Sequence, residues 1–103
     1  MPILTPGRIR HSVVFSLAHA AGSDAEADFI AAITALGEIP GVEAFELLRE
    51  VSPKNDYDHA LTMEFADRAA YTAYDQDPRH VAFVADRWDA EVTAFLEIDA
   101  VSR

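Results

Sequence analysis

The sequence predicts an α+β protein with a ferredoxin-like sandwich fold, in which helices cover one face of a four-stranded antiparallel sheet. Apolar residues alternate in four segments and recur at helical spacing in three others, and these segments follow the order β-α-β-β-α-α-β. Capping residues, prolines and glycines fall between the segments. With 103 residues, half of them hydrophobic, residues 1–103 are expected to form a single domain.

The first strand and first helix have clear signals. Residues 9–17, IRHSVVFSL, have the β-branched content of a strand, and alternation places His11 on its more apolar face. Residues 23–26, Ser-Asp-Ala-Glu, match a capping box, in which the serine and the glutamate satisfy free backbone amides. A helix is therefore predicted to run to about Leu36, with Phe29 on its apolar stripe.

Two further strands follow the first helix. Residues 42–51 are predicted to form the second strand, 52–56 a turn, and 57–65 the third strand. Alternation in the third strand puts His59 in an apolar row with Leu61.

Two helices and a last strand complete the order. Asp67 can cap a short helix through Tyr74, and Asp77 followed by Pro78 favours a new helix start. Helical spacing then continues from Val81 to Val92, and residues 94–101 are predicted to form the last strand.

One face of this sheet is expected to need a cover that the helices do not supply. It carries apolar residues such as Val14, Ala60, Leu96 and Ile98. Packing two such sheets together across a two-fold axis would bury them, so the sequence predicts a homodimer.

The charge balance excludes several partners. The chain has 18 acidic and 8 basic side chains, a net charge of -10, and no cysteine. Binding to nucleic acid or to an anionic membrane needs clustered Lys and Arg, so we expect neither. No segment approaches the roughly 20 apolar residues of a membrane span, and a cytoplasmic protein is expected.

The residues with the best case for chemistry lie between 71 and 80. If Asp77 caps a helix, His80 occupies its third position, where free amides and the helix dipole favour the neutral imidazole that a general base requires. Tyr71 and Tyr74 share one face of the preceding helix, and each hydroxyl can bind a substrate oxygen or a backbone carbonyl. For His80 and Tyr74, catalytic and purely structural roles both remain open.

Other functional motifs are absent from the sequence. It contains no GxGxxG, P-loop, HExxH or nucleophile elbow, and its acidic pairs lack the spacing of a cation-binding loop. No histidine pair has the short helical spacing of a metal site. We therefore expect no cofactor and no metal.

The segments IRHSVVFSL, EIPGVEAFELLREVSP, YDHALTMEF and AYDQDPRHVAF together resemble the stress-responsive dimeric α/β-barrel (Dabb) family from about residue 9 to 101. The resemblance implies a dimeric α/β barrel and a cavity between sheet and helices in each subunit. One characterised member is a cofactor-independent polyketide cyclase, and its tyrosine and histidine fall on Tyr74 and His80. Its other pocket histidines match His11 and His59. Ala32 stands where that cyclase has a tyrosine, and Asp77 stands where many family members have a histidine, which leaves the substrate open.

The leading hypothesis is a cofactor-independent lyase or cyclase acting on a small hydrophobic, polyketide-like carbonyl compound, with His80 as base and Tyr74 as acid. The alternatives are a non-catalytic stress-response dimer that binds a hydrophobic metabolite, and a cofactor-independent monooxygenase. The residues expected to bind the substrate are His11, His59, Tyr71, Phe29, Phe83 and Trp88.

Overall fold

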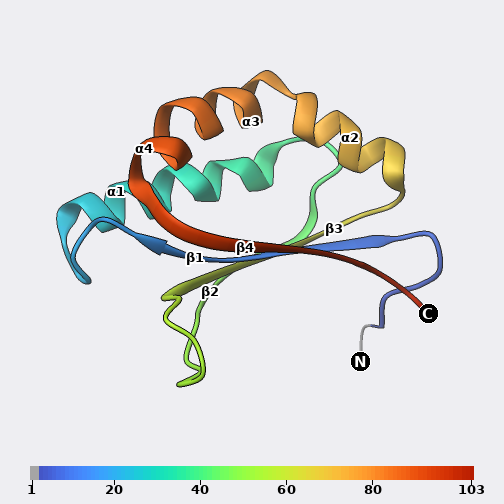
Figure 1. The fold of residues 1–103 in the computed structure, drawn as a ribbon. Coiled ribbons are helices and arrows are strands. Elements are labelled where there is room, and N and C mark those ends of the chain that lie inside the picture. The colour runs from blue at the N-terminus through green and yellow to red at the C-terminus, as the bar shows by residue number, and fades with distance from the viewer. Residues whose placement is uncertain (1–2) are drawn as a thin grey trace.

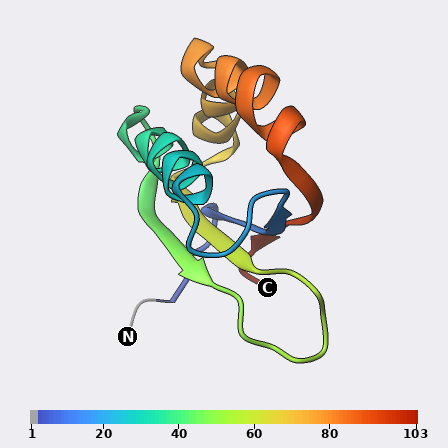
Figure 2. The same ribbon diagram turned by 90° about the vertical axis from the view of Figure 1, so that its left-hand side faces the viewer.

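The computed structural model describes residues 3–103 and has the predicted α+β architecture (Figure 1). Its elements are β1 (Ile9–Leu17), α1 (Asp24–Thr34), η1 (Ala35–Glu38), β2 (Glu43–Arg49), β3 (His59–Phe65), α2 (Arg68–Gln76), α3 (Pro78–Phe83), η2 (Val84–Trp88), α4 (Asp89–Glu91) and β4 (Val92–Val101). The strands form one antiparallel sheet in the order β2-β3-β1-β4. Figures 1 and 2 show the helices on a single face of this sheet, which confirms the predicted fold class.

The register of the strands decides which side chains face the helices. His11 in β1 lies opposite Met63 in β3 and opposite Asp99 in β4. Because side chains alternate along a strand, the alternate residues of β1 from Ile9 to Leu17 are buried beneath the helices, with His11 among them. The same alternation puts His59 on the helix side of β3, as predicted.

Side-chain caps begin three of the helices where the sequence predicts them. The Ser23 hydroxyl accepts from the Glu26 amide, and the Asp67 carboxylate accepts from the Ala70 amide at 2.8 Å. Asp77 accepts from the Arg79 amide and begins α3, with proline next to it. The chain therefore turns sharply between α2 and α3.

Several boundaries differ from the prediction, among them the starts of three strands. β2 begins with a bulge, in which Ala44 has a left-handed φ of 49°, and its regular pairing begins only at Glu46. β3 begins at His59 because the Tyr57 amide binds the Asn55 side chain in a turn. Val92 was expected on the helical stripe, but it begins β4.

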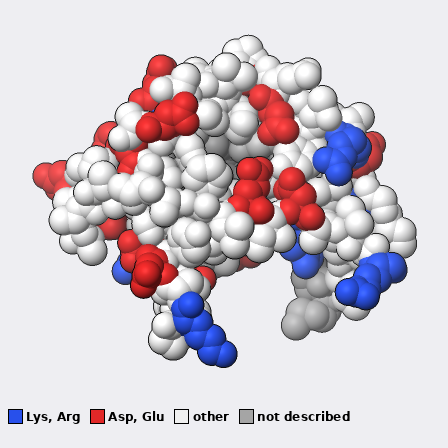
Figure 3. All heavy atoms as spheres, in the orientation of Figure 1, with Lys and Arg blue, Asp and Glu red and all other residues white. Residues whose placement is uncertain are grey.

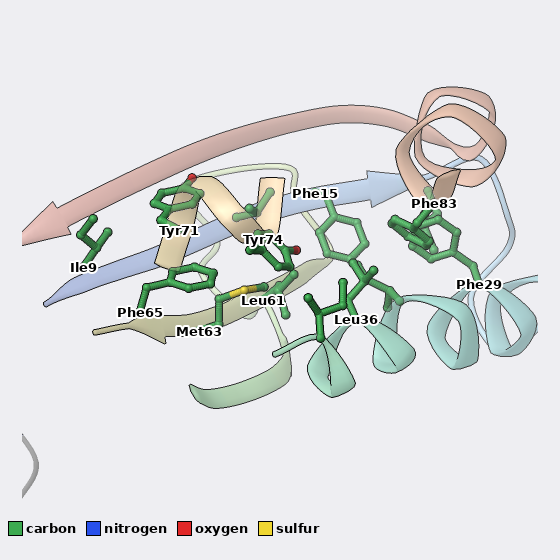
Figure 4. Packing of buried hydrophobic residues seen from close by; sticks show 14 residues of the cluster. Ile9, Phe15, Phe29, Leu36, Leu61, Met63, Phe65, Tyr71, Tyr74 and Phe83 are labelled. Atoms are coloured by element: carbon green, nitrogen blue, oxygen red, sulfur yellow. The ribbon is translucent and has the colours of Figure 1, made fainter. Parts of the chain in front are cut away.

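The hydrophobic core lies between the sheet and the helices. Figure 4 shows buried side chains of β1 and β3 facing those of α1, α2 and α3. Aromatic rings make up much of it: Phe15 packs against Phe29 at 6.0 Å and against Trp88 at 5.1 Å between ring centroids, and Phe65 stacks on Tyr71 at 4.9 Å.

The opposite face of the sheet has no helix over it. A row of apolar residues crosses all four strands in register, formed by Leu48, Ala60, Val14 and Leu96. Leu48 and Leu96 are 46% and 51% exposed, and Ile98 nearby is 51% exposed. This row, with Ile98, is called the outer apolar face below.

No helix within residues 3–103 has both the length and the apolar character needed to cross a membrane.

Replacement of Phe15 tests the packing of this core. Phe15 is fully buried, so Phe15→Ala should lower the free energy of unfolding by about 3–5 kcal/mol in urea denaturation. Val81→Ala, at a position 53% exposed on α3, is the control and should cost less than about 1 kcal/mol. Equal effects of the two substitutions would contradict the core described here.

Candidate functional site

A cavity of about 310 Å³ lies between the helical layer and strands β1, β3 and β4. Its lining residues are His11, Val13, Ile33, Leu36, Leu61, Tyr74, Asp75, His80, Phe83, Val84, Trp88, Asp89, Phe95 and Glu97. The volume suits a small organic molecule, at the lower end of the range for ligand pockets.

The cavity has an apolar interior and an acidic opening. The aliphatic and aromatic side chains inside come from the sheet and from several helices, and most of them are buried. The exposed lining residues are Asp75, Asp89, Phe95 and Glu97. Figure 3 shows a hollow between the helical layer and β4, with acidic side chains around it.

Tyr74 and His80 lie next to each other in the cavity wall, with ring centroids 4.4 Å apart. The Tyr74 residue is only 2% exposed, and within residues 3–103 its hydroxyl has no hydrogen-bond partner. Since no buried side-chain polar atom in these residues lacks a partner, the hydroxyl is accessible from the cavity. Because most buried tyrosine hydroxyls are hydrogen-bonded, an unpaired hydroxyl in a cavity wall is available to a ligand.

The break between α2 and α3 brings these two side chains together. Tyr74 is near the end of α2, and Asp77 ends α2 and caps α3. His80 consequently occupies the third position of α3, as the sequence predicts, and its Nδ1 lies 3.1 Å from the backbone oxygen of Asp75. A carbonyl oxygen can only accept, so Nδ1 carries a hydrogen and Nε2 is the acceptor of the neutral ring.

His11 belongs to a second polar group at the cavity, which links β1, β4 and α2. Its Nδ1 lies 2.6 Å from Asp99 Oδ1 and 2.9 Å from the Tyr71 hydroxyl. The Tyr71 hydroxyl donates to the same carboxylate at 2.9 Å. Because a carboxylate only accepts, Nδ1 of His11 donates to Asp99, and Nε2 is again the acceptor of the neutral ring.

Burial and negative charge act on both tyrosines. Burial raises the pKa of Tyr74, and the charges of Asp75 and Glu97 raise it further. Burial also raises the pKa of Tyr71, with the hydrogen bond to Asp99 as the next cause. Both hydroxyls therefore keep their protons at neutral pH and act as hydrogen-bond donors.

His11, Glu97 and Asp99 also form a group whose nitrogen and oxygen atoms lie within 4.8 Å of one another, as metal ligands do. Hydrogen bonding already accounts for this group, because Asp99 receives hydrogen bonds from both His11 and Tyr71. The three residues therefore give no support for a metal site.

The structure brings together some of the residues predicted for the site and separates others. Five line the cavity: His80, Tyr74, His11, Phe83 and Trp88. Tyr71 and Phe29 do not line it, since Tyr71 lies behind His11 and Phe29 is fully buried in the core. His59 does not reach it either, because it stacks on the other side of Phe15, with Nε2 3.7 Å from Glu26.

Sequence reasoning missed the acidic residues of the site, Asp75, Asp89, Glu97 and Asp99. Alternation with Leu96 and Ile98 puts Glu97 and Asp99 on the helix side of the sheet. The register between β1 and β4, which a single sequence does not reveal, places Asp99 opposite His11. Asp89 lies at the opening beside Trp88, after the five-residue π-helical turn η2, and such turns are frequent at functional sites.

Residues 9–102 match the sequence profile of the Stress responsive A/B Barrel Domain, or Dabb, family. The chain belongs to this family. Among curated proteins, none matches the chain.

Solved structures of similar proteins agree with the Dabb assignment. A Dabb protein with a ferredoxin-like fold from Mesorhizobium loti is 55% identical, with a TM-score of 0.91 over 94% of this chain and 98% of the other. A dimeric ferredoxin-like protein from Thermobifida fusca is 19% identical, with a TM-score of 0.77 over 97% and 95%. A hydroxynitrile lyase from Passiflora edulis is 18% identical, with a TM-score of 0.80 over 96% of both chains. At such low identity, the last two show the fold alone.

The cap between α2 and α3 predicts a specific pH dependence. Hydrogen bonds from the Arg79 side chain and amide lower the pKa of Asp77 from 3.8 to about 2. Because the folded state holds this pKa below the unfolded value, the stabilisation is complete above about pH 4 and is lost as the pH falls through about 2. As the pH is lowered from about 4 to about 2, the urea concentration at the midpoint of unfolding should fall less steeply for Asp77→Asn than for the unsubstituted protein.

Asp86→Asn, an exposed acidic position in η2, is the control and should follow the unsubstituted protein. Parallel curves for Asp77→Asn and the unsubstituted protein would show that the cap does not contribute.

Proposed function

We propose that this Dabb protein is a cofactor-independent lyase or cyclase that acts on a small hydrophobic carbonyl compound, with His80 as the base and Tyr74 as the acid. The observation that carries the proposal is the Tyr74 hydroxyl, which is unpaired within the described chain and is accessible from an apolar cavity beside His80. A tyrosine that served only as core filler would not need a hydroxyl there.

The proposed reaction begins with removal of a proton from the carbon next to the carbonyl group. The proton moves to Nε2 of His80, and the electron pair of the broken C–H bond forms an enolate. Tyr74 donates its hydroxyl hydrogen bond to the oxygen on which the negative charge develops. In a cyclisation, the enolate carbon then bonds to a second carbonyl carbon, the π electrons of that carbonyl group move to its oxygen, and this oxygen takes the proton from Nε2 of His80. In a lyase, the same steps run in reverse.

The remaining lining residues would bind and orient the substrate. His11, held by Asp99 and Tyr71, would supply a second fixed imidazole ring in the cavity wall. Phe83 and Trp88 supply apolar contacts. The hydroxynitrile lyase from Passiflora edulis shares this fold, so the fold can carry lyase chemistry.

We also propose that the protein forms a homodimer through the outer apolar face. Leu48, Leu96 and Ile98 are each about half exposed and lie on one uninterrupted side of the sheet. The similar protein from Thermobifida fusca is described as dimeric. Two copies packed face to face would remove this apolar surface from water.

The alternative is a non-catalytic dimer that binds a hydrophobic metabolite in the same cavity. The mostly apolar lining favours binding of such a molecule whether or not a reaction follows. Turnover distinguishes the two functions.

Deuterium exchange tests the first step without knowledge of the natural substrate. In D2O, the protein should accelerate exchange of the protons next to the carbonyl of 4-phenyl-2-butanone, followed by proton NMR. His80→Ala should reduce this acceleration by about a hundred- to ten-thousand-fold, the usual contribution of a general base. Tyr74→Phe should reduce it by about a hundred- to a thousand-fold, as for loss of one oxyanion donor.

His59→Ala is the matched control, because His59 lies outside the cavity, and it should leave exchange unchanged. Tyr74→Phe should also unfold at the same urea concentration or a higher one, since it removes only an unpaired hydroxyl. No acceleration by the unsubstituted protein, or equal acceleration by His80→Ala, would favour the non-catalytic alternative.

Solution mass tests the dimer. At micromolar concentration, light scattering should give twice the mass of the chain, and Leu96→Glu should give the monomer mass because it buries a charge in the interface. Val81→Glu is the control, with a similar exposure of 53% on the helical layer, and should remain dimeric. A monomer mass for the unsubstituted protein would refute the proposed interface.

A further inference from the structure

The charges around the cavity restrict what can enter it. Three carboxyl side chains line it: Asp75 at the end of α2, Asp89 at the start of α4, and Glu97 on β4. Among residues 3–103, no Lys or Arg side chain lines it, and histidines are its only basic groups. Carboxyl groups from three different elements therefore meet at a single opening.

Neighbouring arginines do not offset these charges, because each is bound to acidic partners outside the cavity. Arg79 contacts Asp77 at 2.8 Å, and Arg87 contacts Asp28 at 2.7 Å and also binds Glu91. In Figure 3, the basic side chains visible on this face lie away from the hollow. An anionic ligand would find no guanidinium or ammonium partner at the cavity wall.

Inside the cavity, the negative field reaches the position that the substrate oxygen would occupy. Asp75 and Glu97 both add to the rise in the pKa of the Tyr74 hydroxyl. A ligand carboxylate near Tyr74 would meet the same two charges. It would also lose its hydration in an apolar space, at a large cost when no cation compensates.

We propose that the cavity selects carbonyl compounds that carry no negative charge, either uncharged or cationic, and excludes free keto acids and phosphorylated carrier esters. The inference rests on the proposed function, because it names the substrate class of the same site. The carboxylates of Asp75, Asp89 and Glu97 repel anionic ligands at the opening, and these three residues are called the charge filter below. Tyr74 and His80 contact the carbonyl group of the ligand.

Binding of three probes of similar size and shape tests the filter directly. The probes are 3-phenylpropanamide, 3-phenylpropylamine and 3-phenylpropanoate, which are neutral, cationic and anionic at pH 7. Trp88 is the only tryptophan of the chain and lines the cavity, so its fluorescence reports occupancy without any turnover. The amide and the amine should each bind at least about tenfold more tightly than the carboxylate at low salt. The difference should shrink as salt is added.

Asp89→Asn should reduce the preference for the amide over the carboxylate by about two- to fivefold, because it removes one of the three charges. Asp86→Asn is the matched control: it makes the same charge change three residues earlier, at an exposed position outside the cavity, and should leave the preference unchanged. Isothermal titration calorimetry on the same proteins gives the affinities independently of fluorescence.

The proposal is overturned if the carboxylate binds as tightly as the amide, or if none of the three probes binds by either method. It is also overturned if Asp86→Asn changes the preference as much as Asp89→Asn does. A charge preference without deuterium exchange would refute the proposed reaction and leave the filter standing. Deuterium exchange without a charge preference would refute the filter and leave the proposed reaction standing.

Discussion

The pairing register between β1 and β4 is the constraint on which the site depends. It places Asp99 directly opposite His11 and Glu97 opposite Val13, with all four side chains on the helix side of the sheet. A shift of one residue would move Glu97 and Asp99 to the outer apolar face and leave buried His11 without its acceptor. The hydrogen bonds of Asp99 with His11 and Tyr71 therefore join sheet and helix only in this register.

The helix break at Asp77 and Pro78 supplies the other half of the site. It turns the chain so that Tyr74 from α2 and His80 from α3 lie side by side, across the cavity from β4. No buried side-chain polar atom within residues 3–103 lacks a hydrogen-bond partner, so the unpaired Tyr74 hydroxyl is accessible from the cavity, where a ligand can bind it.

The sequence predicts the fold well because its signals are local. Alternation, the caps at Ser23, Asp67 and Asp77, and the position of His80 in α3 all appear in the structure as expected. The set of residues that line the cavity is less predictable, since it depends on contacts between distant segments. His59 shares the helix-side face with His11, but Phe15 lies between His59 and the cavity, and no spacing rule shows this. The acidic opening likewise arises from three segments that meet only in the folded chain.

The cavity beside Tyr74 and His80 is the proposed ligand site. The four histidines of the chain test it in one experiment, because His11 and His80 line the cavity while His19 and His59 lie elsewhere. Imidazole proton–nitrogen NMR spectra can be recorded while 3-phenylpropanamide is added to the labelled protein. Binding in the cavity should shift the His11 and His80 resonances and leave those of His19 and His59 unchanged. Shifts confined to His19 or His59 would place the ligand outside the cavity and refute the proposed site.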